Sequence, residues 1–207
     1  TTLVLGNLWA LSQRTTKRLL AYSGIGHVGY ILLGFLTVDQ FGTAMVLFYL
    51  VAYSFTNLGA FLVVEAVSKN GTGSDKLEDF SGLGRRAPWL ALSMLLFLLS
   101  LAGIPFVVGF WAKLYVFVAA WRAGYAWLVL VGALLAVAAL FYYMQLARAM
   151  YMEPPKTEEK VVVPPALTVA IVLALAGVVG FGVYPASVLD QAESAASAAF
   201  QTAPAQP

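Results

Sequence analysis

The 207-residue sequence has no cysteine, one histidine and few charged residues. The absence of cysteine excludes a disulfide framework, a thiol metal site and cysteine ligands for an iron–sulfur cluster. Aspartate, glutamate, lysine and arginine make up only 11% of the residues, whereas a soluble domain has about 25%. No feature of the sequence supports a metal site. The composition excludes an ordinary soluble domain.

The sequence also lacks an initiator methionine and a charged segment ahead of its first apolar run. It opens Thr1-Thr-Leu3, already within that run. We therefore expect no signal peptide. Because the chain begins inside an apolar run, we expect it to be a fragment of a longer protein.

Hydrophobic residues make up 61% of the chain and fall into six apolar runs. Several runs approach 20 residues, the length that crosses a hydrocarbon core about 30 Å thick. We predict an all-α polytopic membrane helix bundle that forms a single membrane domain over residues 1–207, with about five full transmembrane helices and a partial one at the start. The predicted helical runs are residues 1–12, 17–37, 42–68, 87–120, 126–151 and 163–184.

The run 87–120 is too long for one straight crossing, since about 34 residues of helix span roughly 50 Å. Gly103, Pro105 and Gly109 lie within it. Glycine and proline interrupt helices, and a break at membrane depth must face a cavity or neighbouring protein. We predict a broken helix with its break at 103–109.

The basic residues divide unequally between the two ends of the predicted bundle. One end has only Arg122, and Lys113 lies within a span. By the positive-inside rule, the basic loops face the cytoplasm, and the short tail 186–207 lies on the outer side. The ten basic residues of the other end are Arg14, Lys17, Arg18, Lys69, Lys76, Arg85, Arg86, Arg148, Lys156 and Lys160.

Lys113 and His27 are predicted to lie at similar depth on different helices. Each is nine residues from a basic residue at a span end, which is about 13 Å along a helix. A charge at membrane depth is expensive and usually functional, so we predict that both belong to a proton path. Two alternatives remain: Lys113 snorkels to the interface, or His27 is a packed, neutral hydrogen-bonding residue.

Hydroxyl and amide side chains are candidates to extend this polar layer. Lys17, at the basic end of its span, is either a topology anchor or a proton entry. The individual hydroxyls are weak evidence, because serine and threonine also serve helix packing. The candidate supporting residues are Lys17, Tyr53, Asn57, Ser100 and Tyr115; Tyr22, Ser23, Tyr30, Ser54 and Thr56 are further members of the layer.

Four segments together resemble the antiporter-like membrane subunits of respiratory complex I. They contain Gly6-Asn-Leu-Trp-Ala-Leu-Ser-Gln13 with Ile25-Gly-His27-Val-Gly-Tyr30, then Tyr53-Ser-Phe-Thr-Asn57-Leu-Gly-Ala-Phe61, then Leu99-Ser-Leu-Ala-Gly103-Ile-Pro105 with Gly109-Phe-Trp-Ala-Lys113, and finally Tyr142-Tyr143. The second segment favours bacterial subunit N over its two sister subunits. Phe106 departs from the family, whose members often have a second proline there.

The resemblance implies that the chain is the C-terminal part of a longer subunit, with its second inverted repeat and final helices. It implies a role for Lys113 in the outward proton route, beside the broken helix, and places His27 near the central hydrophilic axis. It also implies a bacterial plasma-membrane location and other complex I membrane subunits as partners, besides the lipid bilayer. We expect no nucleic-acid partner.

The favoured interpretation is a proton-translocating subunit of NADH–quinone oxidoreductase, in which Lys113 alternates between charged and neutral states. We expect no cofactor in this chain; NADH, FMN, iron–sulfur clusters and quinone are expected in partner subunits. One alternative is a subunit of a multi-subunit Na⁺/H⁺ antiporter with the same fold. Another is a non-conducting membrane scaffold, which predicts that neutralising Lys113 and His27 costs neither assembly nor transport.

Overall fold

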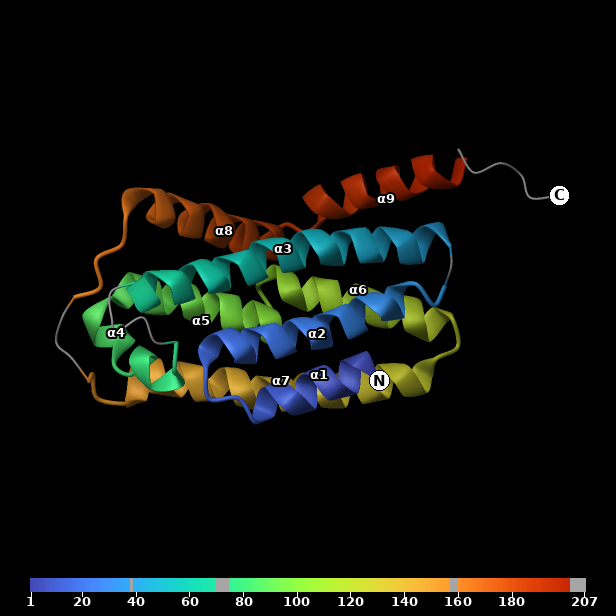
Figure 1. Cartoon of the computed structure of the whole chain (residues 1–207). Coiled ribbons are helices and arrows are strands. Elements are labelled where there is room, and N and C mark those ends of the chain that lie inside the picture. The colour runs from blue at the N-terminus through green and yellow to red at the C-terminus, as the bar shows by residue number, and fades with distance from the viewer. Residues whose placement is uncertain (38, 70–74, 157–159, 202–207) are drawn as a thin grey trace.

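The computed structural model describes residues 1–37, 39–69, 75–156 and 160–201, and these form an elongated bundle of roughly aligned helices (Figure 1). The described residues contain no named strand, only one isolated bridge. The elements in chain order are α1 (Thr2–Leu11), α2 (Thr16–Gly34), α3 (Gln40–Lys69), the 3₁₀ helix η1 (Leu77–Phe80), α4 (Leu83–Arg86), α5 (Pro88–Ala102), α6 (Val108–Arg122), α7 (Ala126–Met152), α8 (Pro165–Val183) and α9 (Ala186–Gln201).

The predicted all-α membrane bundle is confirmed; each predicted run forms one helix within a few residues of its expected bounds, except 87–120, which forms two. Among the described residues, three helices are long and apolar enough to cross a membrane alone: Gln40–Ser68, Ala126–Met152 and Pro165–Val183. The other two predicted crossings are built differently. The sequence of α2 includes Lys17, Arg18 and His27, and the fourth crossing consists of two 15-residue helices, α5 and α6.

Apolar side chains on the outside of α7 support a membrane setting. Several of them are more than 60% exposed and recur every three or four residues, so they share one face of the helix. A soluble protein rarely exposes such a stripe. The residues are Trp127, Leu130, Leu134, Val137 and Phe141.

The connections between helices alternate between the two ends of the bundle (Figure 1). The α1–α2, α3–α5 and α7–α8 connections meet at one end, which is the end predicted to be basic. A short antiparallel bridge ties two of them together: the amide of Thr16 donates to the carbonyl of Asp75 at 2.7 Å, and the amide of Leu77 donates to that of Arg14 at 3.1 Å. The predicted loop alternation is therefore present in the fold.

Helices α5 and α6 lie end to end alongside α3, with an irregular segment between them (Figure 1). Gly103 ends α5 in the left-handed region, at φ +86°, and Phe106 has φ +76°. A left-handed conformation is costly for a residue that has a Cβ, so Phe106 is a point of backbone strain. The break covers residues 103–107, two residues shorter than predicted, because Gly109 already belongs to the first turn of α6.

The C-terminal end of α8 packs against this break. The indole Nε1 of Trp111 donates to the carbonyl oxygen of Gly182 at 2.8 Å. A Cβ at Gly182 would come within 2.5 Å of the Cα of Val107, so the two backbones are in close contact. The start of α6 is thus connected to α8.

The described part of the expected tail, residues 186–201, is the helix α9. The 16 residues of α9 lie along the half of α3 opposite to that covered by α8 (Figure 1). Ala192 and Ala196, four residues apart, are its buried contacts, and Gln40 of α3 donates a hydrogen bond to Ser197. Alanine favours helix, and small side chains let α9 approach α3 closely.

Candidate functional site

Lys113 is buried, at 5% exposure, and projects from α6 back onto the end of α5. Its Nζ donates hydrogen bonds to the carbonyl oxygens of Leu101 at 2.7 Å and Ala102 at 3.0 Å. The last carbonyls of a helix have no partner within the helix, and the helix dipole favours a cation there. The break therefore creates a site that a lysine ammonium satisfies.

The face of Tyr30, on α2, completes the surroundings of the Lys113 ammonium. Nζ lies 4.9 Å from the centre of that ring, within the range of a cation–π contact. The Tyr30 hydroxyl donates to the carbonyl oxygen of Gly132 at 3.0 Å, which fixes the ring against α7. Helices α5 and α2 thus contact the ammonium, and α7 holds the Tyr30 ring in place.

Two glycines make the approach of α6 to α5 possible. Gly103 has positive φ, and a Cβ there would lie 2.8 Å from Cδ of Lys113. A Cβ at Gly109 would overlap the carbonyl oxygen of Ser100. Instead, the amide of Gly109 donates to Ser100 Oγ at 3.1 Å. A side chain at either position would force apart the two half-helices that form the lysine site.

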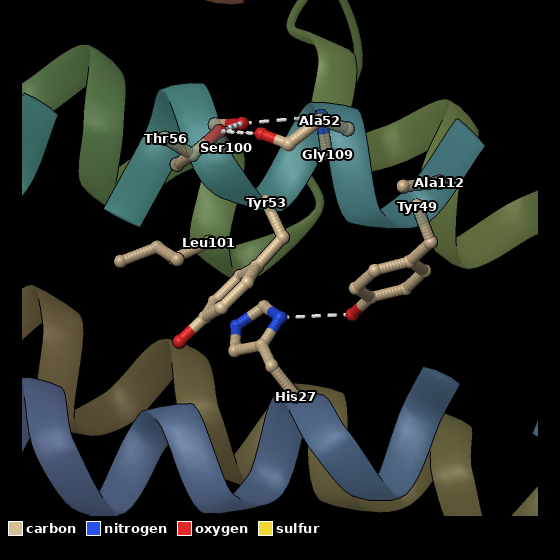
Figure 2. A pocket seen from close by; sticks show the side chains of 9 residues that line it. All are labelled: His27, Tyr49, Ala52, Tyr53, Thr56, Ser100, Leu101, Gly109 and Ala112. Atoms are coloured by element: carbon tan, nitrogen blue, oxygen red, sulfur yellow. Dashed lines mark hydrogen bonds between the residues drawn. The ribbon is translucent and has the colours of Figure 1, made fainter. Parts of the chain in front are cut away.

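His27 is a residue of α2, which packs against α6, and its side chain lines a narrow cavity (Figure 2). Its Nδ1 is 2.8 Å from the hydroxyl of Tyr49, and the Tyr53 ring stacks on the imidazole at 5.0 Å with an interplanar angle of 25°. The centre of a water-sized sphere can move through about 10 Å³ of this cavity, so the cavity has room for about one water. It is lined by His27, Tyr49, Ala52, Tyr53, Thr56, Ser100, Leu101, Gly109 and Ala112.

A hydroxyl pair on the cavity wall connects α3 to the broken helix. Thr56 Oγ1 and Ser100 Oγ are 3.0 Å apart, and both side chains are buried (Figure 2). Ser100 also accepts the hydrogen bond from Gly109, and Leu101, whose carbonyl binds Lys113, lines the same cavity. The histidine cavity and the lysine site therefore share the end of α5 as a common wall.

On its other side, His27 meets a group of polar residues from α1, α2 and α7. Its Nε2 is 3.4 Å from the hydroxyl of Tyr143, which also hydrogen-bonds to Ser23. Tyr142 donates to Asn7 Oδ1 at 3.1 Å, and its ring meets that of Tyr143 at 4.5 Å. Asn7 and the tyrosine pair have no predicted role beyond their place in the family motifs. Their signal was that they are polar groups inside apolar runs.

The predicted site residues divide into those that meet at this centre and those that do not. His27, Tyr53, Ser100 and Gly109 line the cavity, with Lys113 and Gly103 adjoining it. Pro105 lies in the break itself.

The remaining predicted residues lie elsewhere. Lys17 is exposed at the basic end of α2, about 15 Å along the helix from His27. Asn57 is half-buried on α3, outside the cavity lining. Tyr115 packs edge-to-face on Phe48, with ring centres 5.1 Å apart. A direct contact of these three with the cavity is not seen.

The described part of the chain holds no group of three or more histidine, cysteine or acidic side chains that could bind a metal ion. The chemistry available at the centre is therefore that of an amine, an imidazole and several hydroxyls. These groups can bind, release and pass protons.

Known proteins are similar to this chain over most of its length. Among curated relatives, NADH-quinone oxidoreductase subunit N 2 of Roseiflexus castenholzii is 44% identical over 196 residues, covering 91% of this chain and 39% of the relative. Subunit N of Moorella thermoacetica is 42% identical over 196 residues, covering 94% of this chain and 41% of the relative. The chain thus spans about two fifths of the length of these relatives.

Solved structures show the same fold. A chain of respiratory complex I from Thermus thermophilus with bound aureothin matches with a TM-score of 0.79 and 38% identity, over 91% of this chain and 43% of that one. A chain of the Mrp complex from Dietzia sp. matches with a TM-score of 0.84 at 22% identity, over 95% of this chain and 45% of that one, a likeness of fold alone. The profile of the family described as "NADH:quinone oxidoreductase/Mrp antiporter, TM" matches residues 1–139, which include both His27 and Lys113. The chain therefore belongs to the NADH:quinone oxidoreductase/Mrp antiporter transmembrane family.

Proposed function

We propose that this chain is part of a proton-translocating membrane subunit of NADH–quinone oxidoreductase, in which protons pass through Lys113. The observation that carries the proposal is the position of its ammonium, buried and held by the two carbonyl oxygens that the break in α5–α6 exposes. A buried, ionisable amine beside a broken helix and a polar cavity is the kind of group that marks ion pathways in membranes.

The contacts of Lys113 explain how one site can favour either protonation state. The carbonyls of Leu101 and Ala102 and the ring of Tyr30 stabilise the ammonium, while burial away from water favours the neutral amine. These opposing effects leave the balance sensitive to small changes in distance or in nearby charge. A displacement of α6 that is short compared with the length of a hydrogen bond would then release or recapture a proton.

In this proposal, quinone reduction in partner subunits supplies the driving force. NADH, FMN, iron–sulfur clusters and quinone belong to those partners, and this chain contributes the second inverted repeat and final helices of one membrane domain. In this proposal the basic end faces the cytoplasm of a bacterium, following the positive-inside rule, and α9 lies along the outer half of α3. Lys113 would then exchange protons with the histidine cavity and with the outer side.

Replacement of Lys113 by methionine in the assembled, vesicle-reconstituted complex tests the proposal. Methionine fills similar volume and cannot carry a proton. We expect proton translocation and the coupled quinone reductase rate both to fall by about tenfold or more, since positioned proton-transfer groups typically contribute 10²–10⁴-fold. The matched control is Lys160→Met at an exposed position, which should leave both rates unchanged. Full pumping by an assembled Lys113→Met complex would refute the proposal.

A subunit of a multi-subunit Na⁺/H⁺ antiporter is the second candidate, and the fold likeness to the Mrp complex is compatible with it. The two assignments predict different behaviour. NADH–quinone reductase activity that copurifies with the full-length protein favours the first, whereas Na⁺-dependent proton exchange without that activity favours the second. A non-conducting scaffold predicts that Lys113→Met leaves transport intact.

A further inference from the structure

His27 has hydroxyl groups on both sides of its ring. Nδ1 is 2.8 Å from Tyr49 on α3, at the cavity, and Nε2 is 3.4 Å from Tyr143 on α7, away from it. Both tyrosines are almost completely buried. A neutral imidazole has one donor and one acceptor nitrogen, so the two hydroxyls must take opposite roles toward it. Exchange of these roles is equivalent to the transfer of a proton across the ring.

The Tyr143 side continues into further polar groups rather than ending in apolar packing. Tyr143 hydrogen-bonds to Ser23, and its ring packs against that of Tyr142, with the ring centres 4.5 Å apart. Tyr142 in turn donates to Asn7, whose amide donates to the carbonyl oxygen of Leu3 at 2.7 Å. Asn7, Ser23 and Tyr142 are each 1% exposed. Polar atoms therefore run from the cavity to α1 through the core of the bundle.

Packing alone does not explain why these positions carry hydroxyl groups. Phenylalanine would fill the space of Tyr143 without a hydroxyl to desolvate, and Tyr49 already supplies His27 with one hydrogen bond. The Tyr143 hydroxyl gives the second nitrogen a partner that can both donate and accept. Ser23 gives that hydroxyl a partner of the same kind.

The geometry points to a fork of the polar layer at His27, with Tyr143 and Ser23 as a second proton-transfer arm toward the α1–α7 interface. This inference rests on the proposed function of the chain. The arm starts from the tautomer with hydrogen on Nδ1. Tyr143 passes its hydroxyl proton to Nε2, and Nδ1 passes its proton to Tyr49.

Water is the co-reactant at both ends of this transfer. Tyr49 gives its own hydroxyl proton to a water in the cavity, Ser23 refills Tyr143, and a hydronium refills Ser23. One proton enters, one proton leaves as hydronium, and every hydroxyl and the imidazole end neutral. Only the tautomer of His27 has changed, and the reverse steps, which restore it, carry one proton back from the cavity to Ser23.

The test is Tyr143→Phe in the assembled full-length complex, reconstituted in vesicles, with the initial rate of NADH-driven proton translocation as the readout. The substitution removes one oxygen and keeps the ring. We expect the initial rate of proton translocation to fall about tenfold, below the 10²–10⁴-fold that a fully rate-limiting transfer group contributes. The matched control is Tyr151→Phe on the same helix, at an exposed position, which should have no effect.

Two further variants separate a transfer role from a structural one. In a His27→Gln background, Tyr143→Phe should cause no additional loss, since both act on the same arm; a merely structural tyrosine would cause a further loss. If Tyr143→Phe does not assemble, Ser23→Ala is expected to give the same tenfold decrease. An assembled Tyr143→Phe or Ser23→Ala complex that pumps like Tyr151→Phe overturns the fork. Loss in Lys113→Met with no loss in either arm variant overturns the fork alone, whereas full pumping by Lys113→Met overturns the proposed function.

Discussion

The ammonium of Lys113 donates a hydrogen bond of 2.7 Å to the carbonyl oxygen of Leu101, twelve residues earlier in the chain and on the other half of the broken helix. In an unbroken helix the carbonyl of Ala102 would accept from the amide of Phe106, whereas the carbonyl of Leu101 would face Pro105, which has no N–H to donate. The break therefore converts a pair of backbone acceptors into a lysine site. The hydrogen bonds from the ammonium to these carbonyls offset part of the cost of burying the lysine and part of the cost of breaking the helix.

Lys113→Arg is expected to abolish proton translocation while assembly persists. A guanidinium can bind the carbonyls of Leu101 and Ala102, so the end of α5 stays satisfied, but it does not deprotonate in proteins. Translocation measured in vesicles should fall as far as in Lys113→Met, with a complex of normal subunit composition. An arginine variant that pumps at the normal rate would mean that the cation is only structural.

Gly103→Ala is expected to destabilise the chain more than Gly124→Ala. Both glycines have positive φ, at +86° and +82°, so alanine costs about 1–2 kcal/mol at either one. Only at Gly103 would the new Cβ also meet Cδ of Lys113, at 2.8 Å; at Gly124 nothing lies within 4 Å. Thermal unfolding of the two variants should therefore show the larger decrease in melting temperature for Gly103→Ala. Equal decreases would show that Lys113 does not pack on this glycine.

Phe106→Pro is expected to destabilise the break, although other family members often have proline there. Phe106 has φ +76°, and proline is fixed near −65°. Phe106→Gly should instead stabilise the chain by up to about 1 kcal/mol, because glycine adopts positive φ freely and the phenyl ring is 85% exposed. The comparison requires thermal unfolding in the same detergent. A proline variant as stable as the glycine variant would contradict the left-handed conformation.

Tyr30→Phe should impair the lysine site less than Tyr30→Leu. Phenylalanine keeps the aromatic face 4.9 Å from Nζ and loses only the bond to Gly132, whereas leucine removes the cation–π contact, which is worth about 2 kcal/mol when desolvated. Translocation rates in assembled complexes should therefore rank wild type, Tyr30→Phe and Tyr30→Leu in decreasing order. Equal rates for the two variants would exclude a role for the ring face.

The ion pair at the basic end is expected to contribute little to stability. Lys156 Nζ lies 2.5 Å from Glu78 Oε2. The hydrogen bond lowers the pKa of the Glu78 carboxyl from 4.5 and raises that of the Lys156 amine from 10.5. The contribution of Glu78 to folding stability is thus present above pH 4.5 and is lost as the pH falls through the lowered pKa. The contribution of Lys156 is present below pH 10.5 and is lost as the pH rises through the raised pKa.

Both contributions are present at neutral pH, but the two groups are exposed to solvent, so screening leaves them weak. Glu78→Gln should therefore change the melting temperature less than Gly103→Ala, with or without added salt. A larger, salt-sensitive decrease would show that the pair holds the loops together.

The helices and the main site residues follow from local features of the sequence. Apolar runs of membrane length predict α3, α7 and α8, and a lysine beside glycine and proline predicts the break near Lys113. These features need no knowledge of tertiary contacts. The helix α9 was missed because its residues are too polar on average to form an apolar run, although they favour helix.

The contacts around His27 could not be read from the sequence in the same way. Tyr143 and His27 are 116 positions apart, and Tyr142 and Asn7 are 135 apart. Their contact depends on how α1, α2 and α7 pack, which residue spacing within one helix does not specify. The left-handed conformation of Phe106 likewise depends on how α6 is placed against α5.

The hydrogen bond from the indole of Trp111 to the carbonyl oxygen of Gly182 joins the lysine-bearing half-helix to α8. Trp111 and Lys113 are two residues apart on one rigid turn, so a shift of α6 that alters the reach of Lys113 also displaces the end of α8. If the proposed protonation of Lys113 moves α6, the end of α8 should move with it, which a pair of labels on α8 and α3 would record.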